Sequence, residues 1–278
     1  MRRFLAGFGF VLLTFVAAVA SADEFRMDTD VYLAGQKEPI GETLTLFTGD
    51  QVYDFTLSAP QEIVVFDSNA QRGTFTLLDV ERRQKTVIST QDVLDYVREY
   101  QLQSRDNNDP TRNKKLSPLF AFAANPEFAE HAEVVAGSTP ELTRIKLEGN
   151  PLSYTVTAHR PKHLEAVQTY RNFTDWIARL NSMRSGNLPP EARIRLNRAL
   201  SERGLLPQEI TRTIVLPGNS LLGEKKSEVT SKHLVNWTLA GSDHKRIEQA
   251  QNYLVTYPTV SFENYVKAQN DAQLARKK

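Results

Sequence analysis

The chain has 278 residues, no cysteine, and 34 Lys and Arg against 33 Asp and Glu, for a formal net charge of +1. The absence of cysteine excludes disulfides, a thiol nucleophile and a lipid anchor on a cysteine side chain. A near-neutral balance gives no electrostatic basis for binding nucleic acid, so we expect no nucleic-acid partner.

The first 22 residues have the pattern of a secretory signal peptide. Arg2 and Arg3 precede an apolar run from position 4 to position 19, and Ala20-Ser21-Ala22 has the small-x-small pattern of a cleavage site. The apolar run is shorter than the roughly 20 residues that a spanning helix needs. We therefore expect residues 1–22 to be removed. Residues 23–278 should then form a single domain with no integral membrane span, periplasmic or secreted from a bacterial cell.

Residues 25–89 are predicted to form an antiparallel meander. In its first strand Phe25, Met27, Val31 and Leu33 share one face, which is the two-residue period of a half-buried strand. Gly49-Asp50 predicts a tight hairpin turn. The later strands are also short and closely connected, which leaves no room for parallel crossovers.

Residues 90–136 are predicted to be a helical and loop insert. Ser89 or Thr90 can cap a helix over about 91–103, and residues 116–136 are expected to be helical in parts. A strand hairpin over 141–158 follows.

The helical stretch 161–204 comes next. Pro161 suits the first turn of one helix, and Pro189-Pro190 can start another that ends at Gly204. Residues 209–274 should supply the last strands and two C-terminal helices, over about 243–256 and 261–274. The fold class is therefore α+β, with an antiparallel sheet covered by several helices.

The order of these first elements resembles the LolA-like group of periplasmic lipoprotein carriers, or a related exported bacterial family. The resemblance covers roughly residues 25–88. It is carried by strands at 25–33, 41–48 and 63–67, and by Tyr53-Asp54-Phe55 and Phe75-Thr76-Leu77-Leu78-Asp79. It implies a strongly curved half-barrel sheet with helices over its concave face, and a lipid or lipoprotein acyl chain as the ligand.

An uncovered apolar concavity in such a sheet would need a ligand. The candidate lining residues are Phe55, Leu57, Phe75, Leu77, Tyr154 and Val156. For each of them the competing interpretation is core packing. The first hypothesis is a non-enzymatic envelope protein that binds or carries an apolar or amphipathic ligand. The alternative is a structural or protein-interaction module of the envelope with no small ligand.

The histidines are the remaining candidates for chemistry. His159 and His163 are four residues apart, but Pro161 lies between them, so we predict no metal site. His233 alternates with apolar residues and is expected to be a partly buried core or rim histidine. Asp243 is expected to cap a helix that carries His244. A hydrolase that uses Asp and His is the third and least favoured hypothesis, and we predict no catalytic residue and no cofactor.

Overall fold

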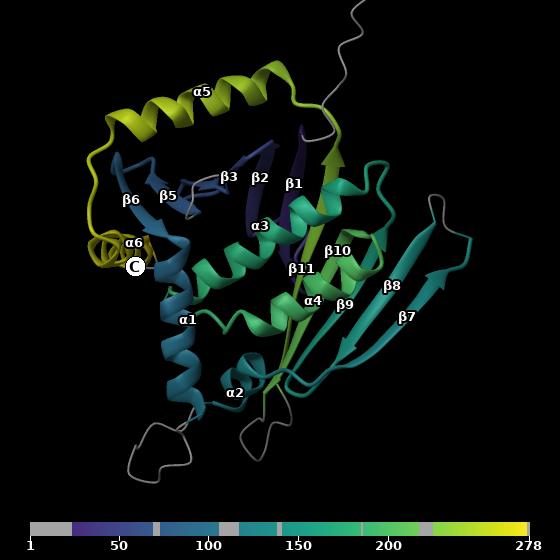
Figure 1. The fold of residues 1–278 in the computed structure, drawn as a ribbon. Helices are drawn as coiled ribbons and strands as arrows, with labels where there is room; N and C mark the ends of the chain where they lie inside the picture. The colour runs from purple at the N-terminus through teal and green to yellow at the C-terminus, as the bar shows by residue number, and fades with distance from the viewer. Residues whose placement is uncertain are drawn as a thin grey trace, which may run out of the picture.

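The computed structural model describes residues 24–68, 73–105, 117–137, 141–184, 186–216 and 225–276, so the predicted signal peptide lies outside the described residues. These residues form one 11-stranded sheet in the order β6-β5-β4-β3-β2-β1-β11-β10-β9-β8-β7, with every neighbouring pair antiparallel (Figure 1). The strands are β1 (Glu24–Leu33), β2 (Gly41–Thr48), β3 (Gln51–Thr56), β4 (Glu62–Asp67), β5 (Thr74–Asp79), β6 (Gln84–Ser89), β7 (Ala129–Val135), β8 (Leu142–Glu148), β9 (Leu152–His159), β10 (Leu206–Leu216) and β11 (Lys225–Asn236).

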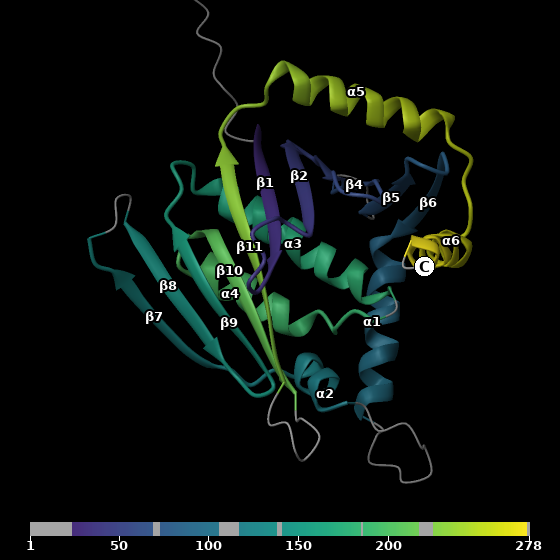
Figure 2. The same cartoon turned by 180° about the vertical axis from the view of Figure 1, so that it is seen from behind.

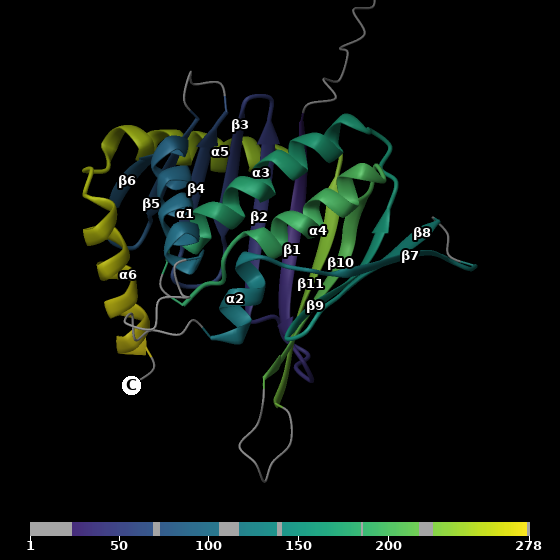
Figure 3. The same cartoon turned by 60° about the horizontal axis from the view of Figure 1, so that its bottom comes forward.

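Helices cover both faces of this sheet. They are α1 (Thr90–Arg105), α2 (Pro118–Ala124), α3 (Glu165–Ser182), α4 (Glu191–Glu202), α5 (Gly241–Thr256) and α6 (Phe262–Arg276). Helices α1 to α4 lie over one face, here called the inner face, and α5 lies over the other, the outer face (Figure 3). Seen from behind, the described chain places no helix over the outer face of β7 to β10 (Figure 2).

Local sequence explains where several elements begin and turn. The β2–β3 turn uses Gly49 at φ +58°, a conformation that glycine adopts without strain. Ser89 caps α1, because its hydroxyl accepts the backbone N–H of Asp92 at 3.1 Å and the Asp92 carboxylate accepts the N–H of Ser89 at 3.1 Å. Pro190 precedes α4, and Gly204 follows it at φ +66°. These observations confirm the predicted hairpin, the cap at Ser89 and the limits of α4.

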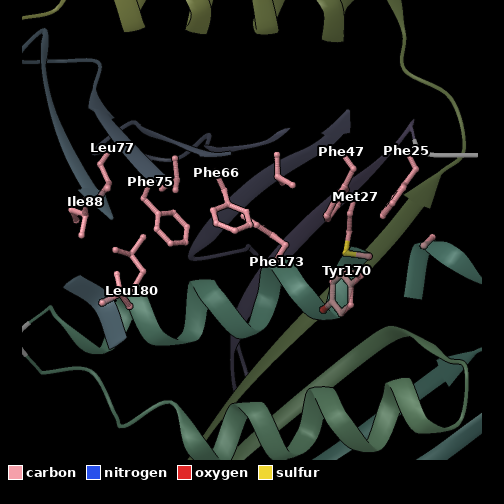
Figure 4. Close-up of a cluster of buried hydrophobic side chains, with 14 of the residues drawn as sticks. Phe25, Met27, Phe47, Phe66, Phe75, Leu77, Ile88, Tyr170, Phe173 and Leu180 are labelled. Carbon is pink, nitrogen blue, oxygen red and sulfur yellow. The ribbon is translucent and has the colours of Figure 1, made fainter. Parts of the chain in front are cut away.

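Three apolar clusters hold the layers together. The first lies between the inner face and α3, where the Phe66 and Phe75 rings stack at 4.6 Å and Phe173 packs edge-on against Phe47 at 5.7 Å (Figure 4). The second joins β8, β9 and β10 to α2 and α4. The third joins the outer face of β2 to β5 to α5 and to Tyr257. Since both faces of β2 to β5 are covered, these strands bury side chains on both sides.

The structure confirms the α+β class and corrects some details. The sheet is open and not strongly curled, so the half-barrel that the resemblance implies does not form. Residues 129–135, expected within a helical and loop insert, form the edge strand β7. Most of its residues are exposed, so no burial-driven alternation marked it as a strand. Helix α3 begins at Glu165 rather than around Pro161.

Candidate functional site

A cleft of about 470 Å³ lies between the inner face of the sheet and helices α3 and α4. Its floor comes from four adjacent strands, β9, β10, β11 and β1, and its walls come from α3, the α3–α4 connection and the start of α4. The lining residues are Val31, Tyr154, Thr174, Ile177, Ala178, Asn181, Asn187, Leu188, Pro189, Pro190, Arg193, Ile210, Arg212, Val229 and Ser231.

The α3 wall of the cleft is one stripe of the helix. Thr174, Ile177, Ala178 and Asn181 are spaced three, four and seven residues from the first, so they share a face that is about 10 Å long. This stripe carries apolar atoms in its middle and a polar side chain at each end. The wall can therefore contact a hydrocarbon segment and hydrogen-bond to a polar group beside it.

The floor combines apolar side chains with a few polar ones. Ile210, Ser231 and Val31 lie side by side across β10, β11 and β1, and Tyr154, Arg212 and Val229 form the next row across β9, β10 and β11. The strand register thus places an arginine directly between an aromatic and an aliphatic side chain. Such a surface suits a ligand with both charged and apolar parts.

Two partly buried arginines, Arg193 of α4 and Arg212 of β10, are the only charged residues that line the cleft within the described chain. The Arg193 Nε donates to Asn197 Oδ1 at 3.0 Å, and a terminal nitrogen of Arg193 donates to the Tyr170 hydroxyl at 3.4 Å. Among the described residues, neither arginine has a carboxylate oxygen within 4.0 Å. Their positive charge is therefore not neutralised by an ion pair there.

The positive charge of these arginines also affects the hydroxyl pKa values of two nearby tyrosines, Tyr154 and Tyr170. Burial raises the pKa of the Tyr154 hydroxyl, and the positive charges of Arg193 and Arg212 partly offset that rise. Burial also raises the pKa of Tyr170, again opposed by Arg193. Both guanidinium groups thus act electrostatically on one hydroxyl at the cleft, where the low local dielectric strengthens such effects.

A hydroxyl–imidazole chain runs from Ser231 of the cleft floor to His233 and Thr29, which are not among the residues that line the cleft. His233 Nε2 is 3.0 Å from Ser231 Oγ, and His233 Nδ1 is 3.0 Å from Thr29 Oγ1. Burial lowers the pKa of His233 to about 3, with a smaller contribution from the positive charge of Arg193. The imidazole is therefore neutral at neutral pH and a weak base. Such a histidine is poorly matched to activating Ser231, because an effective general base has a pKa near the working pH.

Replacing His233 with glutamine should remove one source of acid sensitivity. The folded pKa lies below the ordinary value of 6.5, so the unfolded chain binds the proton first and stability falls as the pH drops through 6.5 toward 3. Between pH 7 and pH 5 the wild type should lose about 1–2 kcal/mol more than His233→Gln. Urea unfolding at pH 7, 6 and 5 measures this difference, with exposed His244→Gln as the control. Parallel pH profiles for the wild type and His233→Gln would contradict the burial of a neutral imidazole.

The structure does not bring the six predicted lining residues together. Tyr154 lines the cleft, and Val156 lies in the cluster beneath α4. Phe75 and Leu77 are fully buried in the cluster under α3. Phe55 and Leu57 pack on the opposite face of the sheet, in the cluster under α5.

The arginines of the cleft were missed by sequence reasoning. One signal was available, because Arg212 stands between Ile210 and Ile214 in the alternation of a predicted strand. An arginine at an inward-facing strand position is unusual and points to a buried anion or counterion. Arg193 gave no comparable signal, since the first turn of α4 is rich in charged residues.

The other candidates take structural positions. His163 Nδ1 is 3.5 Å from Glu165 Oε1, and the His163 ring packs on Trp237 at 5.2 Å. Across the described ranges, no three His, Cys, Asp or Glu side chains are placed to hold a metal ion. Asp243 accepts the backbone N–H of Ala240 at 2.8 Å and pairs with Arg26 at 3.0 Å, which confirms its predicted role at the start of α5.

Comparisons with known proteins do not assign this chain to a family. No family model matches this sequence, and no curated protein matches it significantly. None of the helices that the structure describes is both long enough and apolar enough to span a membrane.

Proposed function

We propose that this chain is an exported, non-enzymatic protein of the bacterial envelope that binds an amphipathic ligand, such as a lipid or a lipoprotein acyl chain, in the α3–α4 cleft. The observation that carries the proposal is the lining of the cleft. Ile177, Ile210 and Val229 offer apolar surface, and Arg193 and Arg212 add charge beside it. A volume of about 470 Å³ lies in the usual range for small-molecule sites.

Two further observations support this function. Residues 1–22 have the pattern of an export signal. Ser231 lines the cleft and contacts the His233 imidazole, but that imidazole is held between two hydroxyl groups by hydrogen bonds and its pKa is about 3. A serine hydrolase would need a stronger base there, usually oriented by a carboxylate. A binding role therefore fits this arrangement better than a catalytic one.

Filling the cleft should weaken ligand uptake. Ala178→Phe places a ring on the α3 wall, and we expect it to lower the affinity for a fluorescent 12-carbon fatty acid by about tenfold or more, which corresponds to about 1.4 kcal/mol. Fluorescence titration measures this affinity. Ala129→Phe on the exposed edge strand β7 is the matched control and should bind as the wild type does. A wild-type protein that takes up no amphiphile at micromolar concentration would contradict the proposed function and favour a structural or protein-interaction module.

A further inference from the structure

We propose that the ligand of the cleft is an anionic amphiphile whose carboxylate or phosphate is held between Arg193 and Arg212. This inference rests on the proposed function and adds the chemical class of the headgroup. The planar guanidinium fork recognises both oxyanions through paired hydrogen bonds, so the two headgroups share one chemistry.

The two arginines reach the cleft from different layers of the fold. Arg193 comes from the first turn of α4, and Arg212 comes from the middle of β10. Tyr154 is the cross-strand partner of Arg212, and the charges of both arginines act on its hydroxyl. Both guanidinium groups therefore line one cleft, on its helix side and its sheet side, and the proposed anion would lie between them.

The protein provides no internal counterion for this pair within the described chain. The nearby carboxylate of Asp175 accepts the Asn197 amide at 2.7 Å and lies 3.6 Å from Arg171. The carboxylate of Glu191 accepts the side-chain amide of Gln101. Partial burial of positive charge without an ionic partner costs free energy, and an anionic ligand would recover part of that cost.

The apolar part of the cleft begins beside the arginines. Val229 is the β11 neighbour of Arg212, and Val31 lies one strand further, with Ile177 on the α3 wall opposite the sheet. A hydrocarbon chain can lie along this surface while its charged end contacts the guanidinium groups. A fully polar anion would leave these side chains exposed, and an uncharged chain would leave the arginines without a counterion.

The test compares ligands that share a 12-carbon chain and differ in headgroup. Dodecanoate, dodecyl phosphate and dodecanol are titrated below their micelle-forming concentrations, at pH 7.5, against the wild type and the variant Arg193→Gln/Arg212→Gln. Because Arg193 also bonds Asn197 and Tyr170, the single variant Arg212→Gln is measured in parallel. The matched control is Arg195→Gln/Arg198→Gln, which removes two exposed arginines from the same helix.

We expect the wild type and the α4 control to bind an anionic ligand about tenfold or more tightly than dodecanol, and both cleft variants to lose most of that preference. The tighter of dodecanoate and dodecyl phosphate identifies the headgroup. Equal binding of all three ligands by the wild type would overturn the anion site and leave the proposed function standing. No binding of any ligand would overturn both.

Discussion

Replacing Phe75 with alanine is expected to lower the free energy of unfolding by about 3–5 kcal/mol. The Phe75 side chain is 0% exposed, and its ring stacks on Phe66 at 4.6 Å and meets Trp176 edge-on at 6.4 Å. Truncation would open a cavity between β5 and α3 that close-packed neighbours fill only in part. Figure 4 shows this ring among the side chains that join the sheet to α3.

The Phe75 variant also distinguishes two roles for this residue, packing in the hydrophobic core and lining a ligand-binding surface. Guanidinium unfolding measures the stability, and Val87→Ala on the half-exposed outer side of β6 is the control, with an expected change within about 0.5 kcal/mol. At a temperature where Phe75→Ala stays folded, its affinity for dodecanoate should match that of the wild type. Unchanged stability together with weakened ligand binding would place Phe75 in a binding surface instead.

Replacing Glu62 with alanine should lower the free energy of unfolding by about 3 kcal/mol, since a buried ion pair would lose one partner. Glu62 is 7% exposed on β4. One of its oxygens pairs with Arg184 at 2.7 Å, and the other accepts the Tyr265 hydroxyl and the Gln269 amide, both at 2.8 Å. A single carboxylate thus ties the end of α3 and helix α6 to the sheet.

The loss of stability should appear as local unfolding of α6 before the rest of the chain unfolds. Since α6 is fastened through Tyr265 and Gln269, limited proteolysis of Glu62→Ala should cut the C-terminal helix faster than the β1–β5 meander. Glu248→Ala, an exposed glutamate on α5, is the matched control. The negative charge of Glu62 also helps burial raise the pKa of Asp54 to about 6, so the variant should lower that pKa. If Glu62→Ala were as stable as the wild type, this would contradict the proposed role of Glu62 in holding α6 to the sheet.

Sequence alternation was sufficient to predict the strands of the first meander, but it did not predict which face of the sheet each side chain takes. Phe55 and Phe75 both sit in clear period-2 patterns, yet Phe55 pairs with Ile63 on the outer face and Phe75 pairs with Phe66 on the inner one. Which face a residue takes depends on register and on the helices that cover each side. With α3 and α5 on opposite faces, an apolar alternation alone cannot tell a cleft from a core.

The cleft depends on contacts between distant parts of the chain. Arg193 and Arg212 line one cleft only because α4 folds back over β10, and Val31 lines it too because β1 pairs with β11. Local patterns predicted the α4 limits from Pro190 and Gly204, and the α1 cap from Ser89. The edge strand β7 was not predicted, because most of its residues are exposed and its sequence lacks the alternation of apolar and polar residues that marks a half-buried strand.

The most direct test of the central claim, that the α3–α4 cleft binds an amphiphile, is native mass spectrometry of the protein purified gently from its own host. Organic extraction of the same sample would identify any bound molecule. We predict one anionic amphiphile per chain, which is lost from the Ala178→Phe variant. A wild-type protein that is empty after gentle purification, and remains empty after incubation with dodecanoate, would contradict the account.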